Sequence, residues 1–283
     1  MTALFALISS ALWGGADFLG GTLSRRLPAF AVVGASQAIA LLVVLPAAFL
    51  VGATGDPLGY LPYALAAGLL GMASLVAFYA ALAAGTMGVV APIAATGVVV
   101  PVVIGLRQGD RPGLLQLCGV ILAVAGVVLA SGPEISGARA GSARGGSRAL
   151  VLALVSAMGF GLVLWLIAKG AHYSVAMTLL TQRCASVSAF AALALVLRNV
   201  GGLGLRDLPQ LAVVGAGDAA ANGLYAVATR SGLISLVAVL GSVYPVVTVL
   251  LARFVHGERL RPMQNLGVVA ALSGVVMIAS GGV

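Results

Sequence analysis

A stripe of polar side chains interrupts an otherwise apolar segment in the second half of the chain. Asp218, Asn222 and Tyr225 follow one another at intervals of four and three residues in GAGDAAANGLYAVATRSG. This spacing places the three side chains on one face of a helix. A polar face directed at lipid is costly, so we expect this one to line an internal cavity and to bind a polar ligand or a proton. Polar packing between helices is the alternative.

Asp17 is a second carboxylate within an apolar segment. It stands in WGGADFLGG, where the glycines on both sides let another backbone or a ligand approach closely. We expect Asp17 to be a cavity carboxylate that binds a cation or a proton. In the alternative interpretation, it lies at a helix end and pairs with Arg25 or Arg26.

Arg183 and Gln37 are polar residues at similar depth in two further apolar segments. A guanidinium group inside a membrane needs an acid, a carbonyl group or water as its partner. Arg183 therefore either binds a substrate carboxylate or pairs with Asp218 or Asp17 as a structural contact, and Gln37 is its candidate counterpart in the first half. If these groups converge, the acid that pairs with Arg183 serves structure or binding, and the other acid is left to exchange protons.

Three aromatic residues complete the set of candidate site residues. Trp13, Tyr79 and Tyr244 each carry an apolar ring with a polar tip, which suits either a cavity wall or an anchor at the membrane interface. Asp110 and Glu258 stand in turns beside arginines. We interpret both as turn and helix-capping residues rather than as catalytic acids.

Signatures of catalysis are missing from the sequence. It contains no HExxH, GxSxG or Walker A motif, and His172 and His256 have no partner at metal-ligand spacing. We therefore expect no enzyme, no cofactor and no metal site. Any work that the protein does must then draw on a gradient.

The composition places these residues in a membrane protein. Of the 283 residues, 61% are hydrophobic and 8% are charged, whereas soluble proteins carry about 25% charged residues. So little charge cannot cover a water-exposed surface. Apart from Arg183, the fifteen basic residues lie between apolar segments or at their ends rather than in one patch, which argues for a lipid bilayer and against nucleic acid as a partner.

Ten apolar segments are long enough to cross a bilayer as helices, which takes about 20 residues each. They form two groups of five, separated by the Gly-, Ser- and Arg-rich segment 132–148, which we interpret as a flexible basic linker. The expected domains are therefore 1–131 and 149–283. The ten predicted spans are 2–22, 29–51, 60–83, 86–106, 113–131, 149–168, 174–197, 209–229, 232–253 and 262–281.

The two groups of five spans are copies of each other. GDRPGLLQLCGVILAVAGVVLAS at 109–131 aligns without a gap on the segment that begins at Gly257, and FALISSALWGG at 5–15 aligns on 152–162. An odd number of crossings per copy inserts the second copy upside down. This is the inverted-repeat plan of many secondary transporters, in which the binding site lies between the halves near the membrane midplane.

The basic residues also predict an orientation. Ten of them, including those of the linker, fall on one side of the membrane and four on the other. Because positively charged loops tend to stay in the cytoplasm, we expect the linker there and both termini outside.

At the level of these motifs the sequence resembles the drug/metabolite transporter superfamily, specifically its ten-helix transporters with two EamA-type domains. The resemblance covers nearly the whole chain and is firmest in YPVVTVLLARFVHGERLRPMQNLGVVAALSGVVMI at 244–278. The residues that carry it are Trp13-Gly14, Pro245, Gly257-Glu258, Gln264 and Gly267.

This resemblance implies transport, because members of the superfamily export amino acids, metabolites, drugs or nucleotide sugars. The sequence departs from the family pattern at Asp110, where Glu is usual, and at Asp17, where many members carry Asn. The family is usually drawn with both termini in the cytoplasm, which is opposite to the orientation that the basic residues predict.

Together these observations predict a secondary active transporter of the cell (plasma or inner) membrane, which exports a small polar or amphiphilic, amino-acid-like metabolite by alternating access. Protons are the candidate coupling ion, because burial of a carboxylate favours its protonated form. Assembly into a homo-oligomer is left open. Efflux of cationic drugs is the alternative within the same class. A non-transporting membrane scaffold or a membrane enzyme is the alternative from another class.

Overall fold

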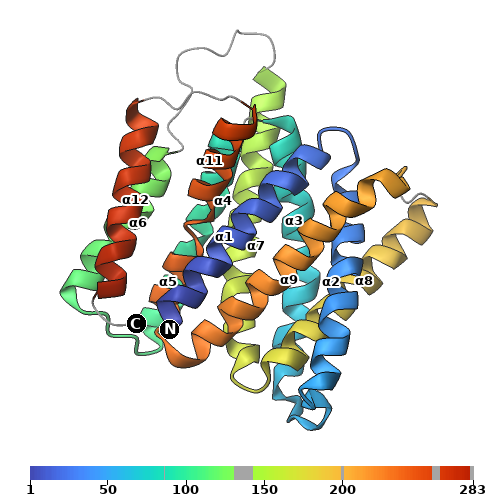
Figure 1. The fold of residues 1–283 in the computed structure, drawn as a ribbon, viewed down its shortest axis with the longest axis horizontal. Coiled ribbons are helices and arrows are strands. Elements are labelled where there is room, and N and C mark those ends of the chain that lie inside the picture. The colour runs from blue at the N-terminus through green and yellow to red at the C-terminus, as the bar shows by residue number, and fades with distance from the viewer. Residues whose placement is uncertain (86, 131–142, 199–200, 257–261, 281–283) are drawn as a thin grey trace.

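The computed structural model describes residues 1–85, 87–130, 143–198, 201–256 and 262–280, which form helices with no strand among them (Figure 1). Four short 3-10 helices join the longer elements: η1 (Ala53–Gly55), η2 (Leu58–Tyr60), η3 (Thr96–Val98) and η4 (Leu205–Asp207). The α-helices are α1 (Thr2–Leu23), α2 (Ala29–Leu50), α3 (Leu61–Ala84), α4 (Met87–Ala95), α5 (Val99–Arg107), α6 (Leu114–Ala130), α7 (Ala143–Ala171), α8 (Val175–Leu197), α9 (Leu208–Ser231), α10 (Ile234–Gly241), α11 (Tyr244–His256) and α12 (Pro262–Ser280).

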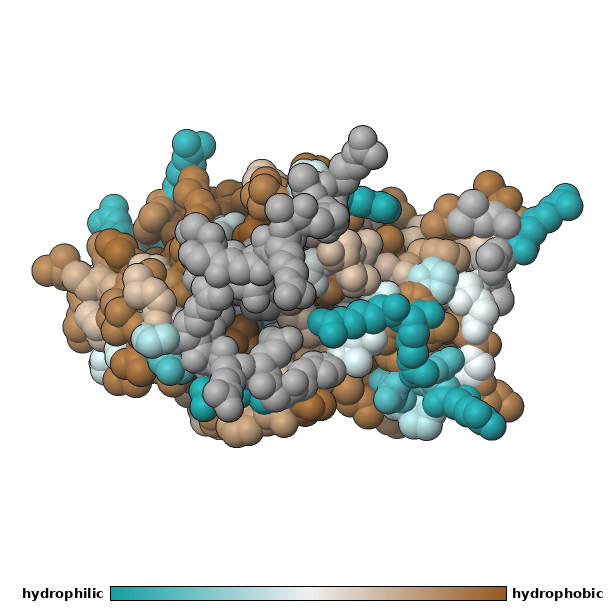
Figure 2. Space-filling view, turned by 90° about the horizontal axis from the view of Figure 1, so that it is seen from above, coloured by the Kyte–Doolittle hydropathy of each residue, from teal (hydrophilic) through white to brown (hydrophobic). Residues whose placement is uncertain are grey.

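The predicted all-α membrane fold is confirmed. Within the described residues, seven helical segments are long and apolar enough to cross a membrane. Shorter apolar helices at Ile93–Arg107, Leu114–Gly126 and Asn265–Ile278 account for the remaining predicted spans. Large apolar side chains such as Leu50, Leu114 and Val196 are exposed, as is expected where lipid replaces water. Figure 2 views the molecule from the upper end of Figure 1. It shows hydrophilic residues on this end and hydrophobic residues around much of the outline.

Two predicted spans are broken rather than continuous, which corrects our expectation for 86–106 and 232–253. In the first, η3 separates α4 from α5, and the Thr96 hydroxyl donates a hydrogen bond to Ile93 O at 2.6 Å. In the second, α10 ends at Gly241, and the Ser242 hydroxyl donates to Ala238 O at 2.6 Å. Pro245 then has no N–H to continue the helix and is tolerated only in the first turn of α11.

The helices of the two halves pack in matching pairs. α1 packs on α9 as α7 packs on α3, and α2 packs on α9 as α8 packs on α3. α2 also packs on α8, and α6 packs on α12, so each of these contacts maps onto itself when the halves are exchanged. This pattern is that of a two-fold relation between the halves. With five crossings in each half, the relation is the inverted repeat that the sequence predicts.

A pair of matched glycines shows the same relation at the level of atoms. A Cβ added to Gly14 of α1 would lie 2.6 Å from Tyr244 O, where α11 begins. A Cβ added to Gly161 of α7 would meet Gly97 O in η3. The two contacts are related by the same 147-residue shift that aligns the fronts of the two copies. Because glycine has no Cβ, it lets α1 and α7, the first helix of each half, pass this close to the broken span of the opposite half.

At the two ends of the bundle, positions that correspond between the halves hold different kinds of side-chain contact. Arg26, in the connection from α1 to α2, lies 2.9 Å from Asp207 and donates to Gln210 at 2.9 Å at the start of α9. The counterparts of Arg26 and Gln210 after the 147-residue shift are Tyr173 and Tyr63. These two rings stack with centroids 6.3 Å apart. The hydrogen bond from Arg26 to Gln210 therefore joins the halves where the matched positions form an aromatic contact.

Part of the predicted linker is helical. α7 begins at Ala143, so residues 143–148 belong to a helix, and the preceding part of the linker lies outside the described residues. A helix that has formed in the apolar segment can add residues at its end at little cost, because only nucleation is unfavourable. The Gly257-Glu258 turn also lies outside the described residues.

Candidate functional site

A cavity of about 90 Å³ lies between the two halves. It is large enough for several water molecules. Its walls come from α1, α2, α3 and α4 of the first half and from α7, α8, α9 and α10 of the second. The polar and aromatic residues that line it are Trp13, Asp17, Gln37, Phe160, Gln182, Arg183, Ser186, Asp218, Asn222, Ser242 and Tyr244.

Asp218 is the centre of a polar network in this cavity. Its Oδ2 atom lies 2.9 Å from Arg183 Nη2 and accepts a hydrogen bond from Gln37 Nε2 at 3.2 Å. Its Oδ1 atom accepts from Trp13 Nε1 at 3.2 Å and from Asn222 Nδ2 at 2.9 Å. Arg183 Nη1 also donates to Gln37 Oε1. Four side chains from α1, α2, α8 and α9 thus surround one carboxylate.

Of the two acids that the sequence offers as partners for Arg183, the structure places Asp218 beside it. Its side chain is 3% exposed, and both of its terminal nitrogens are engaged by Asp218 and Gln37. A buried guanidinium requires this kind of compensation. Nη1 is the terminal nitrogen that donates a hydrogen bond, whereas Nη2 contacts Asp218 as an ion pair and, like Nε, makes no hydrogen bond with the described residues.

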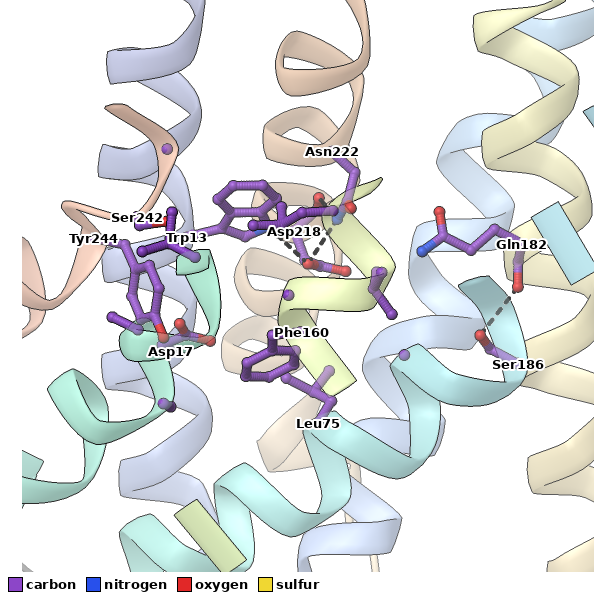
Figure 3. Close-up of a pocket in the computed structure, with 18 of the residues that line it drawn as sticks. Trp13, Asp17, Leu75, Phe160, Gln182, Ser186, Asp218, Asn222, Ser242 and Tyr244 are labelled. Atoms are coloured by element: carbon purple, nitrogen blue, oxygen red, sulfur yellow. Dashed lines mark hydrogen bonds between the residues drawn. The ribbon is translucent and has the colours of Figure 1, made fainter. Parts of the chain in front are cut away.

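Asp17 is placed differently from Asp218. It lines the same cavity and is 8% exposed. Within the described part of the chain, its carboxylate accepts no hydrogen bond and pairs with neither Arg25 nor Arg26. Figure 3 shows it side by side with Tyr244. The cavity thus holds one acid with a cation partner and one without.

Two predicted site residues lie outside the cavity lining. Tyr225 is fully buried behind Trp13, with ring centroids 5.6 Å apart. It shares a helix face with Asp218, but seven residues separate the two by about 10 Å along the helix axis. Tyr79 is 1% exposed and packs against Gly20 of α1. The other seven predicted residues are Trp13, Asp17, Gln37, Arg183, Asp218, Asn222 and Tyr244, and all of them line the cavity.

The structure adds Gln182, Ser186, Ser242 and Phe160 to the cavity, which sequence reasoning did not single out. Gln182 precedes Arg183 directly, so its polar side chain in an apolar segment was a usable signal. Ser242 lies at the break between α10 and α11, which the apolar pattern does not reveal. Phe160 has no sequence feature that distinguishes it from an ordinary core residue.

Asp110 acts as a cap across the two halves. Its Oδ2 atom accepts a hydrogen bond from Ser235 N at 2.9 Å, in the first turn of α10. This agrees with the capping role that the turn motif predicts, although the helix it caps is in the opposite half. Its counterpart Glu258 lies outside the described residues. Over the described ranges, no three His, Cys, Asp or Glu side chains are grouped to hold a metal ion.

Comparison with known proteins gives one family and a fold. The model of the EamA-like transporter family matches residues 1–132 and again residues 147–280. A solved structure titled "Crystal structure of protein" superposes with a TM-score of 0.77 and 16% sequence identity, covering 98% of this chain and 95% of the other. At this identity the likeness shows the fold alone. None of the curated proteins matches the sequence.

Proposed function

The chain belongs to the EamA-like transporter family, and we propose that it is a secondary active transporter that exchanges a small amphiphilic cation for protons. The cargo carries an ammonium group, as an amino-acid-like metabolite or a cationic drug does. Asp17 binds the ammonium group or a proton in turn, as the halves alternate the access to the cavity. The single observation behind this proposal is that the cavity contains two acids and one arginine, and the arginine is already paired.

The charge balance explains why a cation is the favoured cargo. With Arg183 paired to Asp218, Asp17 leaves one negative charge in excess when both acids are ionised. A buried charge without a partner is unfavourable, so a cation or a proton is required to neutralise it. Trp13, Phe160 and Tyr244 line the same cavity, and aromatic faces attract ammonium groups.

A zwitterionic amino acid is the second candidate cargo. Its ammonium group would bind Asp17 as above, and its carboxylate would need an arginine. One observation favours it: Arg183 Nε is buried and donates no hydrogen bond to any residue that the structure describes. Cargo of this kind would have to reach that nitrogen or displace Asp218 from the guanidinium group.

Proton-coupled exchange is tested with purified protein in liposomes that carry an internal pH indicator. We expect butyltrimethylammonium, which cannot cross as a neutral base, to drive protein-dependent proton movement when it is added to one side. Leucine serves as the zwitterionic probe. Proton movement with leucine alone would favour the second candidate, and movement with neither probe would contradict the proposal.

We also propose the orientation that the basic residues predict, with both termini outside the cell. The connection from α7 to α8 lies at the lower end in Figure 1, with the N-terminus, and the connection from α8 to α9 lies at the upper end. In a variant in which the exposed Cys118 and Cys184 are replaced by serine, an impermeant maleimide should label His172→Cys in intact cells and spare Leu205→Cys. The reverse labelling would show both termini in the cytoplasm.

A further inference from the structure

Gln182 is a cavity residue with unused hydrogen-bonding capacity. It lies on α8 beside Arg183, lines the cavity and is 4% exposed. Its Oε1 atom is buried and has no hydrogen-bond partner among the described residues. Buried amide oxygens are nearly always paired, because an unpaired one loses its hydration without compensation. The position therefore requires a partner, and the described part of the chain does not supply one.

The surroundings of Gln182 leave room for such a partner. The neighbouring position on α3 is Gly71, where a Cβ would lie 3.8 Å from Gln182 Nε2, in ordinary contact. The amide carries both a donor and an acceptor, and its terminal torsion is soft, so either atom can be offered to the cavity. Figure 3 shows the side chain reaching from α8 toward Asp218 and Asn222.

Gln182 and Asp17 lie at opposite sides of the cavity. In Figure 3, Asp17 is beside Tyr244 on one side, Gln182 is on the other, and Phe160 and Leu75 lie between them. Both of these intervening side chains line the cavity and are apolar. A molecule that extends from Asp17 to Gln182 therefore meets a polar group at each end. Along its middle it meets the apolar side chains of Phe160 and Leu75 and the ion-paired carboxylate of Asp218.

We propose that Gln182 recognises a hydroxyl or amide N–H group on the cargo whose ammonium group binds Asp17. This inference rests on the proposed function and names the cargo class more closely. The cargo is an amphiphile with an ammonium group at one end, a hydrogen-bond donor at the other, and an apolar chain that packs on Phe160 and Leu75. Gln182 determines specificity, and Asp17 determines whether a cation binds.

Matched pairs of probes test this assignment. Each pair consists of a hydroxyalkyl-trimethylammonium ion and the alkyl ion in which a methyl group replaces the hydroxyl, in a series of increasing chain length. Binding to the purified full-length protein is measured by calorimetry. At the length that fits, we expect the protein to prefer the hydroxyl ion by about three- to tenfold, the contribution of one hydrogen bond.

Gln182→Leu should reduce that preference to less than about twofold and leave the affinity for the alkyl ion nearly unchanged, since the hydrogen bond is the only contribution removed. Ser186→Ala is the matched control, because Ser186 lines the cavity one turn further along α8 but already donates to Gly68 O at 2.8 Å. It should retain the preference. Gln182→Met, of similar length, replaces the leucine variant if that one does not fold.

The outcomes separate the two proposals. A hydroxyl preference that survives in Gln182→Leu or Gln182→Met overturns the assignment of Gln182. The assignment is also overturned if the unchanged protein binds both ions, with binding that requires Asp17, but shows no preference for the hydroxyl ion. Failure of the unchanged protein to bind either member of every pair overturns the proposed function, and this inference with it.

Discussion

Asp17→Asn is expected to abolish cation–proton exchange while leaving the protein folded. Asparagine has the shape of aspartate, but it does not bind a proton at the pH values of the experiment and carries no charge to neutralise an ammonium group. Two unit charges about 4 Å apart attract by roughly 4 kcal/mol at an effective dielectric constant of about 20. Part of this is offset by desolvation of the cation, so we expect affinity for butyltrimethylammonium to fall by at least about 100-fold. The measurement is exchange in liposomes at several pH values.

The folded state should tolerate this change because the described residues form no hydrogen bond or ion pair with the Asp17 carboxylate that the variant would lose. Asp56→Asn is the matched control: it removes the same charge from the connection between α2 and α3 and should leave exchange unchanged. Wild-type rate and pH dependence in Asp17→Asn would contradict the proposed role, and the mechanism would then be exchange without proton coupling at this residue.

The sequence was sufficient to identify both cavity acids but not to assign their roles. Asp17 and Asp218 are recognisable because an acid in an apolar segment is costly wherever the segment lies. Which of them meets Arg183 depends on how three helices are rotated and shifted against one another. No local pattern encodes that register, since α1 is distant in the sequence from α8 and α9, and the three separate helices meet only in the folded bundle.

The same limit explains the residues that were misplaced or missed. Helical spacing assigned Tyr225 to the face of Asp218, and the face is shared, but spacing does not say how far along the helix the cavity extends. At the breaks, the Thr96 and Ser242 hydroxyls donate to Ile93 O and Ala238 O, but Ser74 makes the same kind of bond to Leu70 O within the continuous helix α3. Hydropathy does not distinguish such serines and threonines from neighbours that continue the helix.

Breaking the buried ion pair is expected to have the largest effect on stability. Arg183→Gln leaves Asp218 without its cation, and Asp218→Asn leaves Arg183 without its acid, in a site where the two side chains are 3% and 15% exposed. Removing one partner of a buried pair costs about 3–5 kcal/mol, because the remaining charge is left uncompensated. Each single variant should therefore lose roughly this much unfolding free energy, measured by denaturant titration in detergent micelles.

The double variant Arg183→Gln/Asp218→Asn should recover at least half of the combined loss, because it leaves no uncompensated charge and keeps polar groups beside Gln37 and Asn222. The pair Arg26–Asp207 supplies a matched control: its nitrogen–oxygen distance is also 2.9 Å, but Arg26 is 57% exposed. Arg26→Gln, which leaves the hydrogen bond from Gly204 N to Asp207 in place, should lose less than about 1 kcal/mol. If the losses at Arg183 and Asp218 simply add, the two groups do not compensate each other. Asp218 would then be a second candidate, beside Asp17, for the acid that exchanges protons.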